Sequence, residues 1–232
     1  MTKHLDGPAD TTMMGVVHDA LRRDIGRLDG TFAAGSVNDV QRIALADHIV
    51  WMMDFLHEHH STEDRGLWPL VRTNNPAAGE LLDRMDADHA TIAPIIPTVE
   101  AAATKYRTDP HAQDDLAASL AALSAPLLAH LRREEDDAMP VVSASISDRE
   151  WRAWDQKYNV RGKSLPRLAA EGHWLMDRLD PQRYQILVHL VPAPVRLVVI
   201  KGFAGQYRRA CARRWGPDVA VGPLPAVTSS AA

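Results

Sequence analysis

Two stretches of the chain share one pattern, and together they decide the fold. Residues 59–71 read HHSTEDRGLWPLV, and residues 130–142 read HLRREEDDAMPVV. In both, a His is followed four positions later by Glu and then by a second acidic residue. Pro, an apolar residue and Val follow at matching offsets. The chain therefore contains the same local pattern twice, 71 positions apart.

The likeness extends further towards the N-terminus. Another histidine stands 41 positions before His59 and 41 before His130, at His18 and His89. Each copy of the pattern thus contributes two imidazoles and one carboxylate. Two copies supply four histidines and two glutamates, the donor types that a metal site shared between two helical hairpins needs.

The spacing of apolar residues predicts four long helices around the two copies. They run over about 12–28, from a cap at Ser36 to about Asp64 or beyond, from Asn74-Asn75-Pro76 onwards, and from Asp109-Pro110 to about Met139. Pro94 and Pro97 predict that the third helix is kinked or ends early. We therefore expect an all-α fold, in which residues 12–145 form an up-down-up-down four-helix bundle.

The remainder of the chain predicts a helical extension. Ser147 and Glu150 have the spacing of a capping box that opens a fifth helix. Shorter helices are expected near 166–179, 182–190 and 194–214, separated by prolines. We expect residues 146–216 to pack on the bundle, and residues 217–232, rich in Ala, Val, Pro and Ser, to be a disordered tail.

Charge is distributed unevenly along the chain. Residues 1–146 carry 12 basic and 23 acidic side chains, and residues 147–232 carry 14 basic and 7 acidic ones. The favoured interpretation is that the two parts attract each other. A basic surface for nucleic acid or anionic lipid is the alternative. However, the basic residues are interspersed and no nucleic-acid-binding motif accompanies them, so we expect no nucleic-acid partner.

The cellular compartment is indicated by cysteine usage and hydropathy. Cys211 is the single cysteine, so no disulfide framework exists and a reducing, cytoplasmic location is expected. The N-terminus lacks the apolar segment of a signal peptide, and the longest apolar stretch, 186–200, is interrupted and too short to span a membrane. Arginines surround Cys211 in the sequence and could lower the pKa of its thiol, but a redox function is not favoured for it.

Helical geometry places the repeated His and Glu residues on buried faces. His59 with Glu63, and His130 with Glu134, lie one turn apart on the same helix face, and each pair continues the apolar stripe of its helix. A buried imidazole or carboxylate without a partner costs several kcal/mol, so cations are expected beside them. Nitrogen and oxygen donors without thiolate favour iron or manganese, with zinc a weaker candidate.

The pattern resembles the hemerythrin-like (HHE cation-binding) family. The resemblance covers about residues 12–145 and rests on His, His-x3-Glu, His, His-x3-Glu, with the His-His-x-x-Glu-Asp-x3-Trp-Pro phrase. It implies two iron ions with a bridging oxo or hydroxo group, and a small oxidant (O2, H2O2 or NO) as the partner. The ligands implied are His18, His59, Glu63, His89, His130 and Glu134. No catalytic residue is assigned, and the question of enzymatic turnover stays open.

Two departures from the oxygen-carrying hemerythrins matter. Those proteins have a second His four positions after the helix-3 His, where this chain has Ala93. They also use an Asp five positions after the helix-4 His, where this chain has Glu135. With one imidazole fewer, the centre is expected to be more open to water or peroxide. Chemistry on a small oxidant, or sensing, is therefore favoured over simple oxygen carriage.

Other interpretations remain open at this point. The protein could be an iron- or oxygen-sensing module that relays metal occupancy through its C-terminal region. It could also be a bundle without metal, whose His and Glu are solvated. His60 and Asp64 form a second i, i+4 pair, one residue out of phase, and we expect them beside the site or on the surface. His48 is expected to be an inward-facing histidine with a satisfied hydrogen bond.

Overall fold

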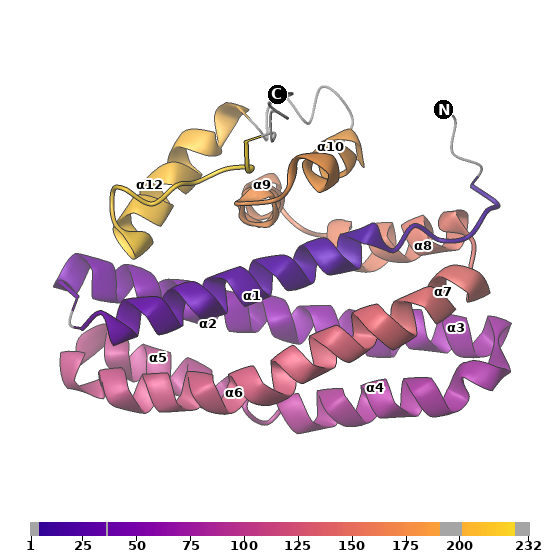
Figure 1. The fold of residues 1–232 in the computed structure, drawn as a ribbon, viewed down its shortest axis with the longest axis horizontal. Coiled ribbons are helices and arrows are strands. Elements are labelled where there is room, and N and C mark those ends of the chain that lie inside the picture. The colour runs from indigo at the N-terminus through magenta and orange to yellow at the C-terminus, as the bar shows by residue number, and fades with distance from the viewer. Residues whose placement is uncertain (1–4, 36, 191–200, 226–232) are drawn as a thin grey trace, which may run out of the picture.

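A computed structural model describes residues 5–35, 37–190 and 201–225, in which all regular secondary structure is helical (Figure 1). The first of four lengthwise rods is α1, Thr12–Ala33. The other rods are made of consecutive elements: α2 (Asp39–Thr62), η1 (Glu63–Leu67) and α3 (Trp68–Asn74); η2 (Pro76–Ala78), α4 (Gly79–Ile92) and α5 (Ile96–Thr108); and η3 (Pro110–Ala112), α6 (Gln113–Arg133), η4 (Glu134–Ala138) and α7 (Met139–Ser145).

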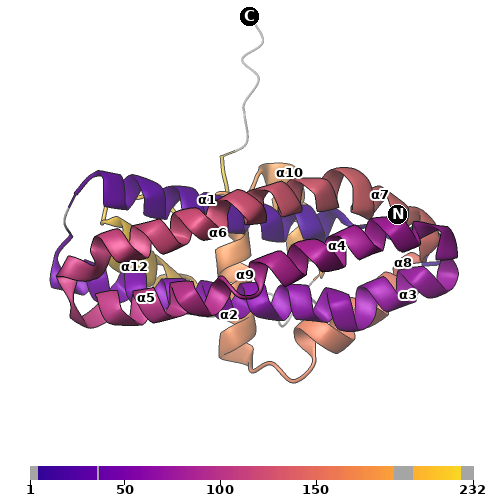
Figure 2. The same cartoon turned by 90° about the horizontal axis from the view of Figure 1, so that it is seen from below.

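The rods form the up-down-up-down four-helix bundle that the apolar spacing predicts. They run side by side along the long axis of the molecule (Figure 2). α6 packs against α1, α4 and α5, and α2 packs against α5. We call residues 12–74 the first hairpin and residues 79–145 the second hairpin.

The second and fourth rods each contain a π-helical turn at the same place in the repeat. The turns begin at Glu63 and Glu134, and each is followed by a helix with proline in its first turn, at Pro69 and Pro140. Proline has no N–H to donate to the preceding turn. The helix can continue past the proline because the wider π turn shifts the backbone hydrogen bonds by one residue, so no bond from the proline nitrogen is needed. The second rod therefore continues beyond Asp64 and past Pro69, to Asn74.

The remaining boundaries follow from local chemistry. The third rod breaks as expected: α4 ends at Ile92 and α5 begins at Ile96, with Pro97 in its first turn. The expected cap of α2, Ser36, lies outside the described residues. Asn38 is the N-cap in the structure, where its side chain accepts a hydrogen bond from the Gln41 N–H at 2.9 Å.

Two apolar clusters fill the bundle, one towards each end. One contains Leu21, Leu56, Ile92 and Leu127, and the other contains Met14, Leu67, Met85 and Ala138. Each rod passes from one cluster to the other, and its repeated His and Glu residues lie where the two clusters meet. The bundle therefore has a buried polar layer between two apolar halves of its core.

The C-terminal helices cover the first hairpin. They are α8 (Asp148–Asp155), η5 (Gln156–Val160), α9 (Leu165–Met176), α10 (Pro181–Leu190) and α12 (Ala204–Trp215). They lie over α1 and α2 in Figure 1: α9 and α10 contact α1, and α12 contacts α2. The capping box of Ser147 and Glu150 opens α8 as expected. Of the helix expected near 194–214, residues up to 200 lie outside the described part.

Residues 217–225 differ from the disordered tail that composition indicates. The Leu224 N–H donates to the Leu179 carbonyl at 2.8 Å, and the Arg178 N–H donates to the Gly222 carbonyl at 2.8 Å. Backbone hydrogen bonds with the segment after α9 hold this stretch, and composition alone does not reveal them.

The attraction expected from the uneven charge is present. Arg167 in α9 lies 3.1 Å from Asp54 and 2.9 Å from Glu58 in α2, and Arg183 pairs with Asp19 of α1. These pairs are partly exposed, so each contributes little by itself. Among the described residues, no helix is long and apolar enough to cross a membrane.

Candidate metal centre

The polar layer of the bundle brings together all six residues that the repeat predicts. Each is at least 92% buried: His18, His59, Glu63, His89, His130 and Glu134. In one half of the layer, His18 Nε2 lies 3.4 Å from His59 Nε2 and 3.2 Å from Glu134 Oε2. The interpretation in which these side chains are solvated and point apart is therefore wrong.

The other half of the layer has the same contacts. His89 Nε2 lies 3.2 Å from His130 Nε2 and 3.6 Å from Glu63 Oε2. The halves are joined by the pairs one turn apart, His59 Nδ1 to Glu63 Oε1 at 3.3 Å and His130 Nε2 to Glu134 Oε2 at 3.5 Å. The six residues thus form a closed ring of contacts, and a shift of 71 positions maps one half of the ring onto the other.

The acidic residue after each glutamate orients a histidine of the opposite hairpin. Asp64 Oδ1, from the first hairpin, lies 2.6 Å from His89 Nδ1. Glu135 Oε1, from the second hairpin, lies 2.8 Å from His18 Nδ1 and also accepts a hydrogen bond from Arg22 at 2.7 Å. A carboxylate at one ring nitrogen fixes the imidazole so that the other nitrogen faces a metal.

His130 is contacted by an acid of its own hairpin. Its Nδ1 lies 3.4 Å from Asp88 Oδ2, and Asp88 is itself paired with Arg133. The residue 71 positions before Asp88 is Val17, so this contact has no counterpart beside His59. The repeat therefore holds for the six residues of the ring, but only in part for the acids that contact them.

The sequence interpretation of His60 needs correction. His60 is 5% exposed, its ring stacks on His89 with centroids 4.1 Å apart, and it meets His130 edge to face at 5.0 Å. The surface alternative is therefore wrong, and the expected place beside the metal-centre residues is the one that the structure has. The available signal was its counterpart Leu131, which continues the apolar stripe of α6 and is buried. A histidine at the matching position of α2 must be buried too.

Geometry divides the donors into two groups that are each compact enough for a cation. His60, His89 and His130 have ligand atoms within 4.8 Å of one another, and so have His18, His59 and Glu134. The two oxygens of Glu63 face His59 and His89, one histidine from each group. This is the arrangement that a carboxylate between two metal ions requires.

Burial and mutual repulsion set the protonation of the ring. Burial lowers the pKa of His59 to about 3 and that of His130 to about 4, so both are neutral, as metal ligands must be. Burial also works to raise the pKa of Glu134, but His18 outweighs it and the pKa falls to about 2. Burial and the charge of Glu134 hold the pKa of Glu63 well above its ordinary value.

Several ligand atoms of the buried polar layer make no hydrogen bond to any described residue. Among the described residues, no hydrogen bond reaches either carboxylate oxygen of Glu63 or of Glu134, and His60 Nε2 has none. The nearest polar neighbours of the two carboxylates are imidazole nitrogens of the same layer at 3.2–3.6 Å, and buried groups so poorly satisfied are destabilising. A pair of cations would satisfy them all, so the residues present fit a metal centre.

Cys211 lacks the environment of a redox thiol, as the sequence favours. It is fully buried in α12, and burial raises the pKa of its thiol. The lowered pKa that the neighbouring arginines could cause is not found, because they do not offset the loss of solvent. By contrast, the prediction for His48 is confirmed: it is buried, with a hydrogen bond to Asp24 at 2.7 Å.

A layer of imidazoles and carboxylates inside four antiparallel helices defines the class of bundle proteins that bind cations between their helices. Residues 9–142 match the family model described as Hemerythrin HHE cation binding domain. The match covers more than half of the chain, which therefore belongs to the hemerythrin HHE family. No curated protein matches the chain, and no solved structure matches it.

Proposed function

We propose that this protein holds two iron ions and binds or reacts with O2, peroxide or NO. The observation that carries the proposal is the closed ring of four histidines and two glutamates, with carboxylate oxygens that lack other partners. His18, His59 and Glu134 would hold one ion, and His89 and His130 the other, with Glu63 shared between them. His60 is an additional imidazole at the second ion. Manganese and zinc are the weaker candidates.

The bound irons would supply the change of oxidation state and a position for the oxidant, together with the solvent-derived bridge expected from the sequence. The chain's own residues hold and orient them. Asp64 and Glu135 fix the rings of His89 and His18 through their Nδ1 atoms. The two apolar clusters exclude water on both sides of the polar layer, which strengthens every charge interaction in it.

His60 bears on whether the metal centre reacts with a small oxidant or only carries oxygen. The imidazole that is absent at Ala93 on the second hairpin is offset by His60 on the first hairpin, whose ring stacks on His89. The centre therefore has five imidazoles and two glutamates within reach, and it is less open than the sequence alone indicates. We keep chemistry on a small oxidant as the favoured function, because Glu135, at the position of the oxygen carriers' ligand, contacts His18 and Arg22.

The test compares two neighbouring histidines of α2. Purified protein should contain about two irons per chain and change its visible absorption on passing from anaerobic to aerobic buffer. His59→Ala should lose iron and consume peroxide at the background rate. The matched control is His57→Ala, since His57 is exposed on the same helix. Equal peroxide consumption by wild type and His59→Ala would exclude the proposed reaction.

A specific contact favours the sensing alternative as a second candidate. Trp154 Nε1 donates to the Thr62 carbonyl at 3.1 Å, and Tyr158 Oη donates to the Arg65 carbonyl at 3.3 Å. Both carbonyls flank or lie within the π turn that begins at Glu63. A shift of Glu63 on metal release would thus reach α8 and η5 directly. Under this proposal, limited proteolysis within residues 140–170 is faster in metal-free protein, and identical digestion of both forms excludes it.

The cytoplasmic location remains a proposal as well. It is supported by the single cysteine, which is buried and without a disulfide. Fractionation of cells that produce the protein tests it.

A further inference from the structure

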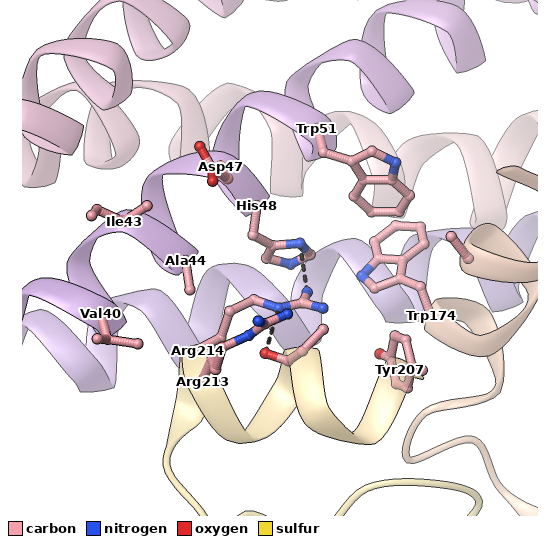
Figure 3. A pocket seen from close by; sticks show the side chains of 12 residues that line it. Val40, Ile43, Ala44, Asp47, His48, Trp51, Trp174, Tyr207, Arg213 and Arg214 are labelled. Atoms are coloured by element: carbon pink, nitrogen blue, oxygen red, sulfur yellow. Dashed lines mark hydrogen bonds between the residues drawn. The ribbon is translucent and has the colours of Figure 1, made fainter. Parts of the chain in front are cut away.

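A cavity outside the metal centre lies between α2, α9 and α12. Its volume is about 530 Å³, which is within the range of pockets that bind small molecules. Trp51, Trp174 and Tyr207 contribute aromatic surface, and Ala44 and Ala210 leave the space open (Figure 3). None of these residues belongs to the ring of metal-centre contacts.

A buried positive charge lies at this cavity. Arg214 is 9% exposed, its Nη1 donates to His48 Nδ1 at 2.7 Å, and its Nε donates to the Ala210 carbonyl at 3.2 Å (Figure 3). Because a guanidinium can only donate, His48 must accept through Nδ1 and carry its proton on Nε2. That proton is donated to Asp24. His48 is therefore neutral and does not compensate the charge of Arg214.

The carboxylates nearby are already bound by other cations. Asp24 lies 2.8 Å from Arg23, and Asp177 lies 2.7 Å from Arg27. The guanidiniums of Arg23, Arg27 and Arg214 thus outnumber the carboxylates of Asp24 and Asp177 by one. One positive charge, that of Arg214, is left without a counter-ion among these groups. Within the described parts of the chain, Arg214 has no carboxylate partner and its Nη2 donates no hydrogen bond. A buried guanidinium without a counter-ion is unfavourable.

The one carboxylate that lines the cavity does not supply the counter-ion. Asp47 is exposed and lies 2.7 Å from Arg107. Exposed Arg213 adds a second cation at the rim. The cavity therefore combines aromatic walls, free N–H donors and an excess of positive charge. A carboxylate is the group that a guanidinium binds best, through two parallel hydrogen bonds.

We propose that this cavity binds a small planar aromatic monoanion, with its carboxylate on Arg214 and its ring against Trp51, Trp174 and Tyr207. The proposal is independent of the metal centre, because it rests on the charge balance and the walls of a different site. It also gives the C-terminal helices a role beyond covering the bundle, since α9 and α12 supply most of the binding groups.

The test uses two probes of equal shape and different charge. The full-length, metal-loaded protein is titrated by calorimetry with 2-naphthoate and with its neutral counterpart, 2-naphthamide. We expect 2-naphthoate to bind one molecule per chain, at least about tenfold more tightly than the amide, equivalent to about 1.4 kcal/mol. Equal affinity for the two probes, or no saturable binding of 2-naphthoate, overturns the proposal.

Three variants locate the binding. Arg214→Met should weaken 2-naphthoate at least tenfold and leave 2-naphthamide unchanged, whereas unchanged 2-naphthoate affinity overturns the proposal. Should that variant not fold, Ala44→Phe, which fills the cavity from α2, serves instead and should abolish binding of both probes. Binding of 2-naphthoate by Ala44→Phe as tightly as by wild type also overturns it. Arg208→Met removes an exposed cation of α12 outside the cavity, and it should bind both probes like wild type.

Discussion

The first hairpin and the second hairpin share the ring of metal-centre residues but differ around it. His60 in the first corresponds to Leu131 in the second, and Gly66 corresponds to Asp137. Likewise Asp24 and His48, which contact the C-terminal helices, correspond to Ile95 and Ser119. The shared positions build the centre, and the differing positions give the first hairpin an extra imidazole and an attachment surface. Each prediction below removes either a shared or a differing feature.

The largest effect is expected from the shared glutamates. Glu63→Ala and Glu134→Ala each remove a carboxylate that contacts both hairpins, so both variants should lose both metals. Ligand binding at a thousandfold excess over Kd stabilises a fold by about 4 kcal/mol. For a chain of this size, loss of that stabilisation lowers Tm by about 8–16 °C. Metal analysis and calorimetry test this, and full metal content in either variant contradicts it.

His60→Leu makes the first hairpin resemble the second. We expect loss of one of the two irons, because only the group of His89 and His130 is affected. We also expect the metal-free variant to be more stable than metal-free wild type by about 1–3 kcal/mol, since an unpartnered buried nitrogen is removed. Metal stoichiometry and denaturant unfolding measure the two effects. If iron content is unchanged, His60 is not a ligand.

Asp64 and Glu135, the outer acids, each contact a histidine of the opposite hairpin. Replacing them tests whether the two contacts contribute equally to metal affinity. Asp64→Asn and Glu135→Gln should each weaken metal binding by about 10–100-fold. The Glu135 variant should show the larger loss, because it also removes the negative charge and one of the two oxygens that Arg22 binds. Competition with a chelator measures both affinities. Wild-type affinity in both variants would show that ring orientation at His18 and His89 does not depend on these acids.

Gly66 and Asp137 occupy matching places in the two π turns. A Cβ on Gly66 would lie 2.5 Å from the Tyr158 ring and 2.8 Å from that of Trp154. Gly66→Ala should therefore displace η5 and destabilise the fold by about 1–3 kcal/mol. Asp137→Ala is the matched control, because Asp137 is exposed and should tolerate the change. Equal unfolding free energies of the two variants would contradict this asymmetry.

The smallest effect concerns His48, which corresponds to Ser119 in the second hairpin. Burial lowers the pKa of His48, and the charge of Arg214 lowers it further, against the hydrogen bond to Asp24. Below about pH 6.5, His48 therefore binds a proton in the unfolded chain but stays neutral in the folded chain. Stability from neutral His48 is present above that pH and is lost as pH falls. His48→Gln should flatten the pH slope of the unfolding free energy by up to about 1.4 kcal/mol per pH unit. An unchanged slope between pH 5 and 7 contradicts this.

Sequence reasoning predicted what the repeat and the helical period determine. The four rods, the break near Pro94 and the convergence of the six His and Glu residues all follow from fixed spacing. The mapping of His60 onto the buried Leu131 indicates that His60 is buried, but it does not predict contact with His89 and His130, because a leucine is no ligand. Nor could sequence reasoning predict the cavity at Arg214, whose charge balance depends on Asp177, a residue that only tertiary packing brings near.

The crossed contacts of the outer acids have a consequence for symmetry. Asp64 of the first hairpin holds His89 of the second, and Glu135 of the second holds His18 of the first. Reciprocal contacts of this kind define an isologous interface, the arrangement found between identical subunits of a twofold dimer. The bundle is thus built like a dimer of hairpins joined into one chain. Neither His18 nor His89 lies in the same hairpin as the acid that orients it.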